Sequence, residues 1–244
     1  MAKQSGLGDR LFVSGYDLSG DSNDISVSCT TETLEVTGLP SSAFERVGAV
    51  RDSTLAWKSW FNPSGAHPVL SALPTTNVLA TYCRGAVLGA PAFSHQSIQT
   101  TYDPKRGNDS SLAMDVETVG AQYAGDWGVQ LTAGARTDTA ATNGASVNDS
   151  AAATAFGGQA YLHLFACTAT ATTKIVIQDS PDNSTWADLV EFAPVVTGVA
   201  PKWERVTVAG NVDKYLRVIT TTTTAINNVQ FAVMFARNEF TVTP

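Results

Sequence analysis

The stretch from Ala133 to Ala155 constrains the fold more than any other part of this 244-residue sequence. It consists almost entirely of Ala, Thr, Gly, Ser, Asn and Asp, and Val147 is its only large aliphatic residue. Such a composition offers little apolar surface to offset the entropy that is lost when a chain becomes ordered. We therefore interpret residues 133–155 as a linker followed by an edge strand. The sequence then divides into two β domains, residues 1–132 and residues 133–244.

The overall composition is that of a folded protein. Hydrophobic residues make up 43% of the chain and charged residues only 15%. The low charge is also typical of a protein whose surface is partly covered by neighbouring copies. The N-terminal residues lack the apolar core of a signal peptide, and no apolar run is long enough to span a membrane. We therefore expect a protein that is made in the cytoplasm and does not insert into a membrane.

Acidic residues are concentrated in the first half of the chain, which has a net charge of −7 overall. Residues 1–132 contain 8 Lys and Arg against 13 Asp and Glu, whereas residues 133–244 contain 7 against 9. Tight binding to nucleic acid needs basic residues that displace counterions from the phosphates. The acidic first half argues against such binding, but it is compatible with a passage through which DNA slides without being held.

Alternating apolar and β-branched residues predict strands along most of the chain. In the first half these strands are expected at residues 9–14, 25–30, 33–37, 54–61, 78–83, 96–102 and 112–119. Residues 40–46 and 65–73 carry helix signals, with Ser41 as the cap of the first and Pro68 near the first turn of the second. After residue 155, strands are expected at residues 159–167, 174–179, 186–190, 203–208, 215–220 and 229–237.

The predicted fold class is therefore mainly β. An N-terminal β-sandwich with a short flanking helix is followed by a C-terminal, jelly-roll-like antiparallel β-sandwich. The core of the second sandwich is expected to contain Leu162, Leu164, Ile175, Ile177, Leu216, Val218, Phe231, Val233 and Phe235. Residues 159–167 are apolar on both faces, which predicts a central strand. Residues 54–61 place Trp57 on one face and Trp60 on the other, so both faces should be covered by a second layer or a neighbouring copy.

Residues 96–119 predict a long β-hairpin. Its charged tip is formed by Asp103, Pro104, Lys105, Arg106, Gly107, Asn108 and Asp109. In the second strand, Ala113, Asp115 and Glu117 share the face opposite to Leu112, Met114 and Val116.

No pattern of residues predicts catalysis, a cofactor or a metal. The three histidines, His67, His95 and His163, have no further ligand at metal-binding spacing. The three cysteines are far apart and are expected to be small buried hydrophobes. Asp179 and Asp182 flank a tight turn, which accounts for them better than a carboxylate pair or a calcium site does. We expect no catalytic, cofactor-binding or metal-binding residue.

Several segments nevertheless match a known pattern. They are Glu35–Gly38 (EVTG), Ala43–Arg46 (AFER), Gly48–Leu55 (GAVRDSTL) and Trp60–Pro63 (WFNP). Together with the opening AKQSGLGDRLFVSGYDLSGD, these segments resemble tail-tube (major tail) proteins of long-tailed bacteriophages, close to those of phages of actinobacteria. The later segments QAYLHLFACT, IVIQDSPDNSTWADL, KYLRV and FAVMFARNE are similar to the outer domain that such proteins append.

This resemblance implies a structural virion protein, without enzymatic activity, that stacks as hexameric rings into a tail tube. DNA would pass through the lumen without specific binding, and the C-terminal domain would decorate the outside. The implied partners are further copies of this chain and other tail proteins, such as the tape measure and terminator proteins. The resemblance also places Asp115 and Glu117 in the lumen and the 103–109 hairpin between subunits.

Two other functions remain open from the sequence. The chain could be a minor tail or adhesion protein whose C-terminal sandwich binds host-surface carbohydrate, with Trp186, Trp203 and Tyr215 stacking on sugars. It could also be a hydrolase whose carboxylates converge only in the fold. The lack of a catalytic constellation and the strands that are apolar on both faces favour the structural role.

Overall fold

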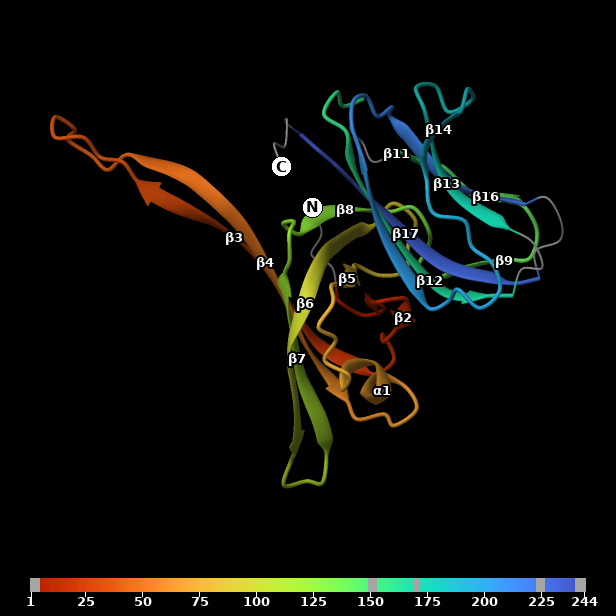
Figure 1. Ribbon diagram of the computed structural model, residues 1–244, viewed down its shortest axis with the longest axis horizontal. Coiled ribbons are helices and arrows are strands. Elements are labelled where there is room, and N and C mark those ends of the chain that lie inside the picture. Colours follow the sequence, from red (N-terminus) through yellow and green to blue (C-terminus); the bar gives the residue numbers. More distant parts are fainter. Residues whose placement is uncertain (1–4, 149–152, 169–171, 223–226, 240–244) are drawn as a thin grey trace. The chain divides into compact units, whose positions relative to one another are not determined.

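The computed structural model describes residues 5–148, 153–168, 172–222 and 227–239. As the sequence predicts, these residues form a mainly β protein of antiparallel strands with one short helix (Figure 1). The elements are β1 (Arg10–Val13), β2 (Tyr16–Asp17), β3 (Ser22–Glu35), β4 (Arg46–Trp60), α1 (Ala66–Leu70), β5 (Val78–Cys83), β6 (Pro91–Arg106), β7 (Leu112–Gly120), β8 (Asp126–Gln130), β9 (Arg136–Asp138), β10 (Thr142–Asn143), β11 (Val147–Asn148), β12 (Gly158–Cys167), β13 (Thr173–Ser180), β14 (Ala187–Glu191), β15 (Lys202–Val208), β16 (Tyr215–Thr222) and β17 (Val229–Arg237).

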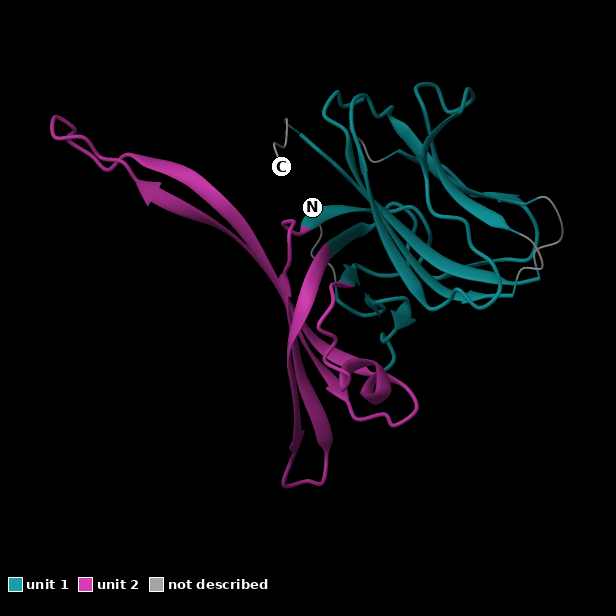
Figure 2. Ribbon diagram, in the orientation of Figure 1, with its two compact units in different colours: residues 1–20, 79–94, 126–244 teal, residues 21–78, 95–125 magenta. Residues whose placement is uncertain are grey.

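The chain divides into two compact units, which Figure 2 colours separately. Unit 1 contains residues 1–20, 79–94 and 126–244, and unit 2 contains residues 21–78 and 95–125. This division differs from a boundary at residue 132, because β1, β5 and β8 belong to unit 1. The reason is backbone pairing, which joins Met234 and Phe235 of β17 to Gln130 and Val129 of β8. That residues 133–244 fold on their own stays a prediction.

Unit 1 is a two-layer β-sandwich. One layer has the order β15-β12-β17-β8, continues through the start of β6 to β5, β1 and β2, and includes β9 beside β17. The other layer has the order β10-β16-β13-β14, with β11 also beside β16. All nine core residues expected from the sequence are buried in one cluster between the layers: Leu162, Leu164, Ile175, Ile177, Leu216, Val218, Phe231, Val233 and Phe235.

The strands β12 and β17 are buried on both faces. Their second faces, which include Tyr161 and Met234, pack against Phe12, Leu79 and Cys83. The strand order β15-β12-β17 also makes β12 an interior strand. The prediction of a central strand, made from its two apolar faces, is therefore confirmed for β12.

The polar stretch after residue 132 is integrated into unit 1 rather than forming a free linker. Its strands β9, β10 and β11 pair with β17 and β16. Arg136 forms a 2.6 Å ion pair with the buried Asp138, which also accepts a 2.7 Å hydrogen bond from Thr220 Oγ1. Ladder and side-chain hydrogen bonds thus hold a segment that has few apolar contacts to offer. Residues 149–152 of the expected linker lie outside the described residues.

Unit 2 contains a four-stranded antiparallel sheet with the order β3-β4-β7-β6. The strands β3 and β4 run far beyond the lengths that the sequence predicts and form a long hairpin (Figure 1). We call residues 30–51, the distal part of this hairpin, the arm. A register shift between Thr31 and Thr33 places a β-bulge within the arm.

The prediction of a helix at residues 40–46 is wrong, because this segment is the turn region of the arm. Val36 N–H donates to the carbonyl of Glu45 at 2.9 Å, which closes the hairpin. Ser41 does not cap a helix; its hydroxyl donates to the carboxylate of Glu45 at 2.9 Å.

The helix expected at residues 65–73 is present as the shorter α1. The side chain of Asp21 accepts hydrogen bonds from Ala66 N–H at 3.1 Å and from the amide of Asn62 at 3.1 Å, and so caps the start of α1. A Cβ at Gly65 would lie 2.5 Å from the Asp21 carboxylate, which explains glycine at that position.

The β6–β7 hairpin is also present, but its tip is shorter than expected. Residues Asp103 to Arg106 are not part of the tip; they extend β6 and pair with β7. The turn itself begins at Gly107, whose N–H donates to the carbonyl of Ser111 at 2.8 Å. The charged side chains had suggested a loop, but strand β6 continues through them to Arg106.

Candidate assembly surfaces

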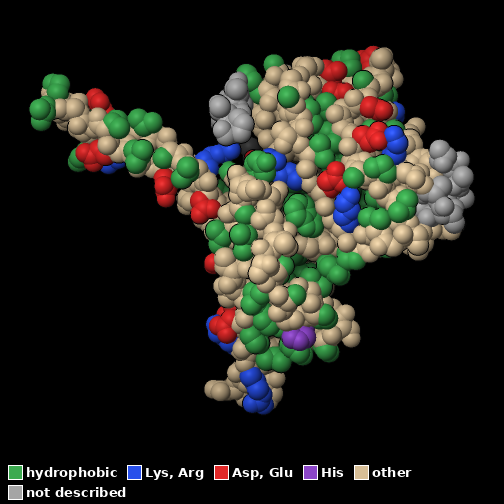
Figure 3. Space-filling view, viewed as in Figure 1, with side chains coloured by type: hydrophobic (Ala, Val, Ile, Leu, Met, Phe, Trp, Pro, Cys, Tyr) green, Lys and Arg blue, Asp and Glu red, His purple; other side chains and the backbone are tan. Residues whose placement is uncertain are grey.

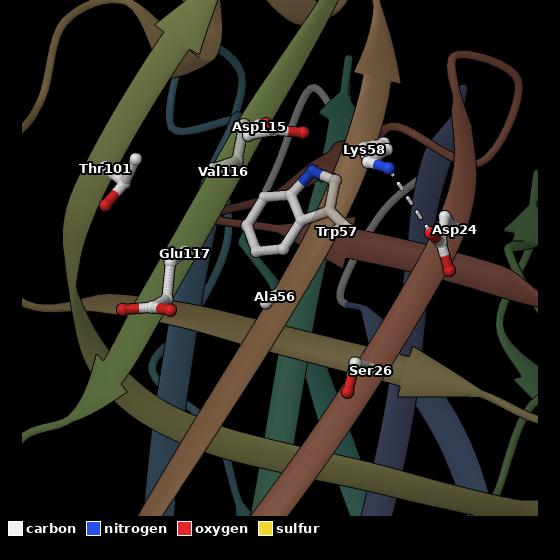
Figure 4. Close-up of a pocket in the computed structure, with 9 residues that line it drawn as sticks. All are labelled: Asp24, Ser26, Ala56, Trp57, Lys58, Thr101, Asp115, Val116 and Glu117. Atoms are coloured by element: carbon white, nitrogen blue, oxygen red, sulfur yellow. Dashed lines mark ion pairs between the residues drawn. The ribbon is translucent and has the colours of Figure 1, made fainter.

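The sheet of unit 2 has one face that is open in this chain (Figure 4). Cross-strand pairing aligns Asp24 of β3, Lys58 of β4, Asp115 of β7 and Asp103 of β6 in one row. The next row contains Ser26, Ala56, Glu117 and Thr101, and most members of both rows line a shallow hollow. We call this surface the acidic face. Asp115 and Glu117 lie on it, as their alternation with the buried Met114 and Val116 predicts.

The charges of the acidic face are partly paired. Lys105 Nζ lies 2.6 Å from Asp115 Oδ2 and 3.2 Å from Asp103 Oδ2, and Lys58 lies 3.8 Å from Asp24. The hydrogen bond from Lys105 lowers the pKa of Asp115, and its two carboxylate partners raise the pKa of Lys105. Both effects stabilise the ionised forms of Asp115 and Lys105. The face is acidic because it carries Asp24, Asp103, Asp115 and Glu117 against Lys58 and Lys105.

Trp60 lies at one end of the acidic face and is 47% exposed. The opposite face of β4, with Leu55 and Trp57, is buried. The sequence predicted that both faces of this strand are covered, by a second layer or by a neighbouring copy. Within the described chain only the Trp57 face is covered.

Both edges of the four-stranded sheet offer unpaired backbone. The strand β3 pairs only with β4, and Thr101 to Arg106 of β6 pair only with β7 among the described strands. Each neighbouring pair in the order β3-β4-β7-β6 is antiparallel, so β3 and β6 run in opposite directions. Unpaired edges of this kind are templates for pairing with another chain.

The arm exposes apolar side chains along its length, as the green atoms on it in Figure 3 show. Phe44 is 68% and Val50 is 67% exposed. The other exposed apolar residues of the arm are Leu34, Val36, Leu39 and Val47. The arm was not predicted from the sequence, although the strand expected at residues 33–37 overlaps the distal part of β3 and was a local signal for it.

The tip of the β6–β7 hairpin satisfies its own polar groups. Ser110 N–H donates to the carbonyl of Gly107 at 3.1 Å, and the Arg106 guanidinium donates to Ser110 Oγ at 3.0 Å. The hydroxyl of Ser111, together with its N–H at 3.0 Å, donates to Asp109, and these contacts lower the pKa of Asp109. The free backbone of this hairpin therefore lies along β6, at Asp103 to Arg106, rather than at the turn.

Two histidines are buried in polar networks. His95 Nδ1 lies 3.1 Å from Ser53 Oγ and its Nε2 lies 3.0 Å from Thr118 Oγ1, and burial lowers the pKa of His95 to about 4. His163 accepts the N–H of Gly15 at 3.3 Å and contacts Thr81 Oγ1 at 2.9 Å, and burial lowers its pKa to about 3. Ser53 and His95 have the residue types of a nucleophile and base, but both are closed off from solvent.

The aromatic residues considered for sugar stacking are engaged within the chain. The Arg217 guanidinium lies over the Trp186 ring at 4.1 Å, and Lys214 Nζ lies 5.2 Å from the centre of the Tyr215 ring. Trp203 packs against the core cluster that contains Phe12 and Tyr161. These three rings do not provide an open platform.

The remaining polar candidates have structural positions. Asp182 accepts the N–H groups of Ser184 and Thr185, which lowers its pKa and closes the expected turn. Among the described residues, no group of three or more His, Cys, Asp or Glu is placed to hold a metal ion. Cys83 and Cys167 are buried as expected, whereas Cys29 is exposed on β3. No helix in the described ranges is long and apolar enough to cross a membrane.

Comparison with known proteins gives distant matches only. No protein-family model matches the chain, and neither does any curated protein. Nine chains of solved structures match. One, from the virion of a native gene transfer agent particle, is 14% identical with a TM-score of 0.40, over 51% of this chain and 98% of that chain. Another, from the tail of an empty gene transfer agent particle with C6 symmetry, is 15% identical with a TM-score of 0.37, over 50% and 96%. These similarities are too distant to define a function for this chain.

Proposed function

We propose that this chain is a structural protein of a phage-type tail, which polymerises with itself into a tube. The observation that carries the proposal is the sheet of unit 2, which leaves one face and both edges open and extends into an exposed apolar arm. The sequence resemblance to tail-tube proteins adds the form of the assembly, stacked hexameric rings, and the further tail proteins as partners. In this proposal the protein belongs to the virion and has no catalytic role.

The free edges support closed rings. Because β3 and β6 run in opposite directions, placing β6 of one copy beside β3 of the next continues the antiparallel sheet. Head-to-tail contacts of this kind close into a ring when the rotation between copies is right. Asp103, Pro104, Lys105 and Arg106 lie on the edge that would form this contact, whereas Gly107, Asn108 and Asp109 lie in or next to the turn.

The acidic face suits the inner wall of such a tube. A closed sheet has one face toward its axis, and unpaired carboxylates there repel the phosphates of DNA. Glu117 supplies this charge more than Asp24 and Asp115 do, because Lys58 lies near Asp24 and Lys105 lies against Asp115. We assign Asp115 and Glu117 to the lumen on this basis.

The first experiment is electron microscopy of the purified full-length protein across a range of concentrations, with sedimentation velocity in parallel. We expect rings or tubes with a central channel, because the open edges and the arm need partners. A protein that stays monomeric at the highest soluble concentration would overturn the proposal.

A charge reversal tests the lumen assignment. In the Asp115→Lys, Glu117→Lys variant we expect tubes that retain linear duplex DNA in cosedimentation at low salt and release it as salt rises, because counterion release governs such binding. The matched control is Asp188→Lys, Glu191→Lys in β14, which adds the same charge to unit 1. Equal retention by both variants, or loss of tubes in the first alone, would contradict a lumen position.

A further inference from the structure

The free edge of β6 has a defined set of backbone groups that it can offer to another strand. In an antiparallel ladder, alternate residues turn their N–H and C=O groups toward the same neighbour. Gly107 N–H donates at 2.8 Å to the carbonyl of Ser111, which lies directly across the β6–β7 hairpin, so Gly107 faces β7. The register from Thr101 to Arg106 is unbroken, so every second residue before Gly107 faces β7 as well. The residues that turn their backbone groups to the free edge are Tyr102, Pro104 and Arg106.

The position of Pro104 agrees with this direction. Proline has no N–H, and within sheets it is found on edge strands, where its nitrogen faces away from the ladder. Pro104 lies opposite Met114 of β7, but its nitrogen points to the free edge, so it costs the β6–β7 ladder no hydrogen bond. The free edge in turn lacks one donor, which makes it a less general template than an edge without proline.

The free edge of β3 is oriented in the same way. Trp60 N–H donates to the carbonyl of Asp21 at 2.7 Å, so Trp60 of β4 faces β3. Lys58, two residues earlier on the same regular strand, therefore also faces β3, and its partner Asp24 faces β4 in return. The register then stays unbroken from Asp24 to Thr31. The next residues of β3 that turn their backbone groups outward are Ile25 and Val27.

Charge distinguishes between the registers in which these two edges can pair. A shift by one residue would turn side chains to the wrong face, so the registers that keep the acidic face continuous differ by two residues. One of them sets Asp103 opposite Asp24, so that two carboxylates meet. The next sets Lys105 opposite Asp24 and Asp103 opposite the uncharged Ser26. A further shift moves Asp24 past the end of β6, where it faces the turn.

The register with Lys105 opposite Asp24 also matches apolar groups on the other face of the sheet. It sets Tyr102 opposite Val27, and aromatic pairs with β-branched residues stabilise neighbouring strands. Val27 can then exchange two backbone hydrogen bonds with Tyr102, and Ile25 N–H can donate to the carbonyl of Pro104. Ile25 and Val27 are only half-buried in the single chain, so this contact would cover them further.

The ion pairs that the two lysines form within one chain do not prevent this contact. Lys105 Nζ lies between Asp115 and Asp103, and its side chain is 63% exposed. Lys58 lies 3.8 Å from Asp24, whose side chain is 71% exposed (Figure 4). Exposed pairs of this kind contribute little to stability. A further carboxylate can therefore approach Lys105 without breaking a strong interaction.

We propose that β6 of one copy pairs with β3 of the next in the register that places Lys105 opposite Asp24 and Tyr102 opposite Val27. This inference rests on the proposed self-assembly and specifies the contact between neighbouring copies. Lys105 selects the register, because the neighbouring registers either lose this ion pair or bring Asp103 and Asp24 together. The partner that the free edge of β6 recognises is thus a second copy of this chain.

Paired cysteines test the register directly. In a Cys29→Ser background, which removes the exposed cysteine, the full-length chain carries Asp103→Cys together with Ser26→Cys and is oxidised under assembly conditions. The two positions lie on opposite edges of a four-stranded sheet, roughly 14 Å apart, which is too far for a disulfide within one chain. We expect a ladder of disulfide-linked oligomers on a denaturing gel.

The matched controls keep Asp103→Cys and move the second cysteine by two residues, to Asp24→Cys or Ser28→Cys. The Ser26→Cys chain should give about ten times the cross-linked yield of either control, because diagonal positions exceed the reach of a disulfide. A higher yield from a control overturns the register, and assembly without cross-links in any chain overturns the edge contact. Both results leave polymerisation itself intact. A parent protein that does not polymerise removes the proposed function and the register together.

Complementation between charge variants gives a second readout that does not depend on cysteines. Lys105→Asp and Asp24→Lys should each raise the concentration needed for assembly about fivefold, because each sets like charges opposite one another. A mixture of the two variants should assemble near the parent concentration, since each contact between unlike copies restores an opposite pair. Mixing cannot repair a lost contact within one chain, such as Lys105 to Asp115. The matched control swaps an exposed ion pair of unit 1, Lys174→Glu with Glu191→Lys, and should assemble like the parent. A mixture that assembles no better than either variant alone would overturn the proposal.

Discussion

The strand β17 and the arm of unit 2 both carry several large apolar side chains, but only those of β17 are covered within the chain. In β17, Phe231 and Phe235 pack into the core of the sandwich, while Met234 packs into the second cluster with Phe12. In the arm, Phe44 and Val50 face solvent. Apolar side chains therefore stabilise the fold in β17, whereas those of the arm are exposed and contact another copy only in the proposed assembly. A strand that is apolar on both faces indicates burial, but it does not say which molecule provides the cover.

The largest effect on stability is expected in the sandwich core. Replacing the fully buried Phe231 by Ala should lower the free energy of unfolding by about 3–5 kcal/mol, through lost apolar burial and the cavity left behind. The matched change Phe44→Ala in the arm should lower it by less than about 0.5 kcal/mol, because the ring is exposed. Denaturant unfolding of both variants measures the contrast. Comparable losses would mean that the arm is packed against its own chain.

Acid should weaken the buried regions more than the arm. His95 and His163 have pKa values lowered by burial to about 4 and about 3, so the folded state binds fewer protons than the unfolded state. Their contribution to the free energy of unfolding is complete above about pH 6.5 and is lost as the pH falls toward their pKa values in the folded state. For His95 the loss is on the order of 3 kcal/mol at pH 4.

Unfolding free energies measured between pH 7 and pH 4 test this dependence. A His163→Gln variant should show a shallower fall with pH than the parent, whatever its stability at pH 7. An unchanged slope would show that His163 does not titrate on unfolding. The arm, residues 30–51, contains no histidine and should not contribute.

A small effect on stability, with the clearest effect on assembly, is expected from removing the arm. Thr30 and Asp52 are paired neighbours at its base, so an Asn-Gly turn can join them in place of residues 31–51. We expect the free energy of unfolding to change by less than about 1 kcal/mol, since the arm contributes nothing to the core clusters. Sedimentation should find folded monomers. Tubes of normal length from this variant would contradict an assembly role for the arm.

The sequence predicted β17 well, whereas it did not predict the arm. The bounds of β5 and β17 match the expected strands residue for residue, because apolar alternation there coincides with burial. The arm was missed because Pro40, Ser41 and Glu45 resemble a capped helix, and because Gly48 and Asp52 interrupt the pattern. The pairing of β17 with the short β8, which sets the composition of unit 1, leaves no local signal.

The candidate surfaces, too, were predicted where the signal is local and missed where distant segments meet. Alternation placed Asp115 and Glu117 on one face correctly, because a strand has only two faces. The hollow that Trp127 and Phe156 line together could not be found, since these isolated aromatics are far apart in the sequence. The hydrogen bonds that integrate residues 133–148 likewise join residues that are distant along the chain, such as Asp138 and Thr220.

The β-bulge between Thr31 and Thr33 limits how two free arms can pair with each other. A long, flat pair of strands with exposed valines and leucines would stack on its own kind and precipitate. A bulge bends and twists the strand that carries it, so two free arms cannot align over their full length. If the chain polymerises as proposed, this bend lowers the tendency of free copies to aggregate through their arms before they reach the tube.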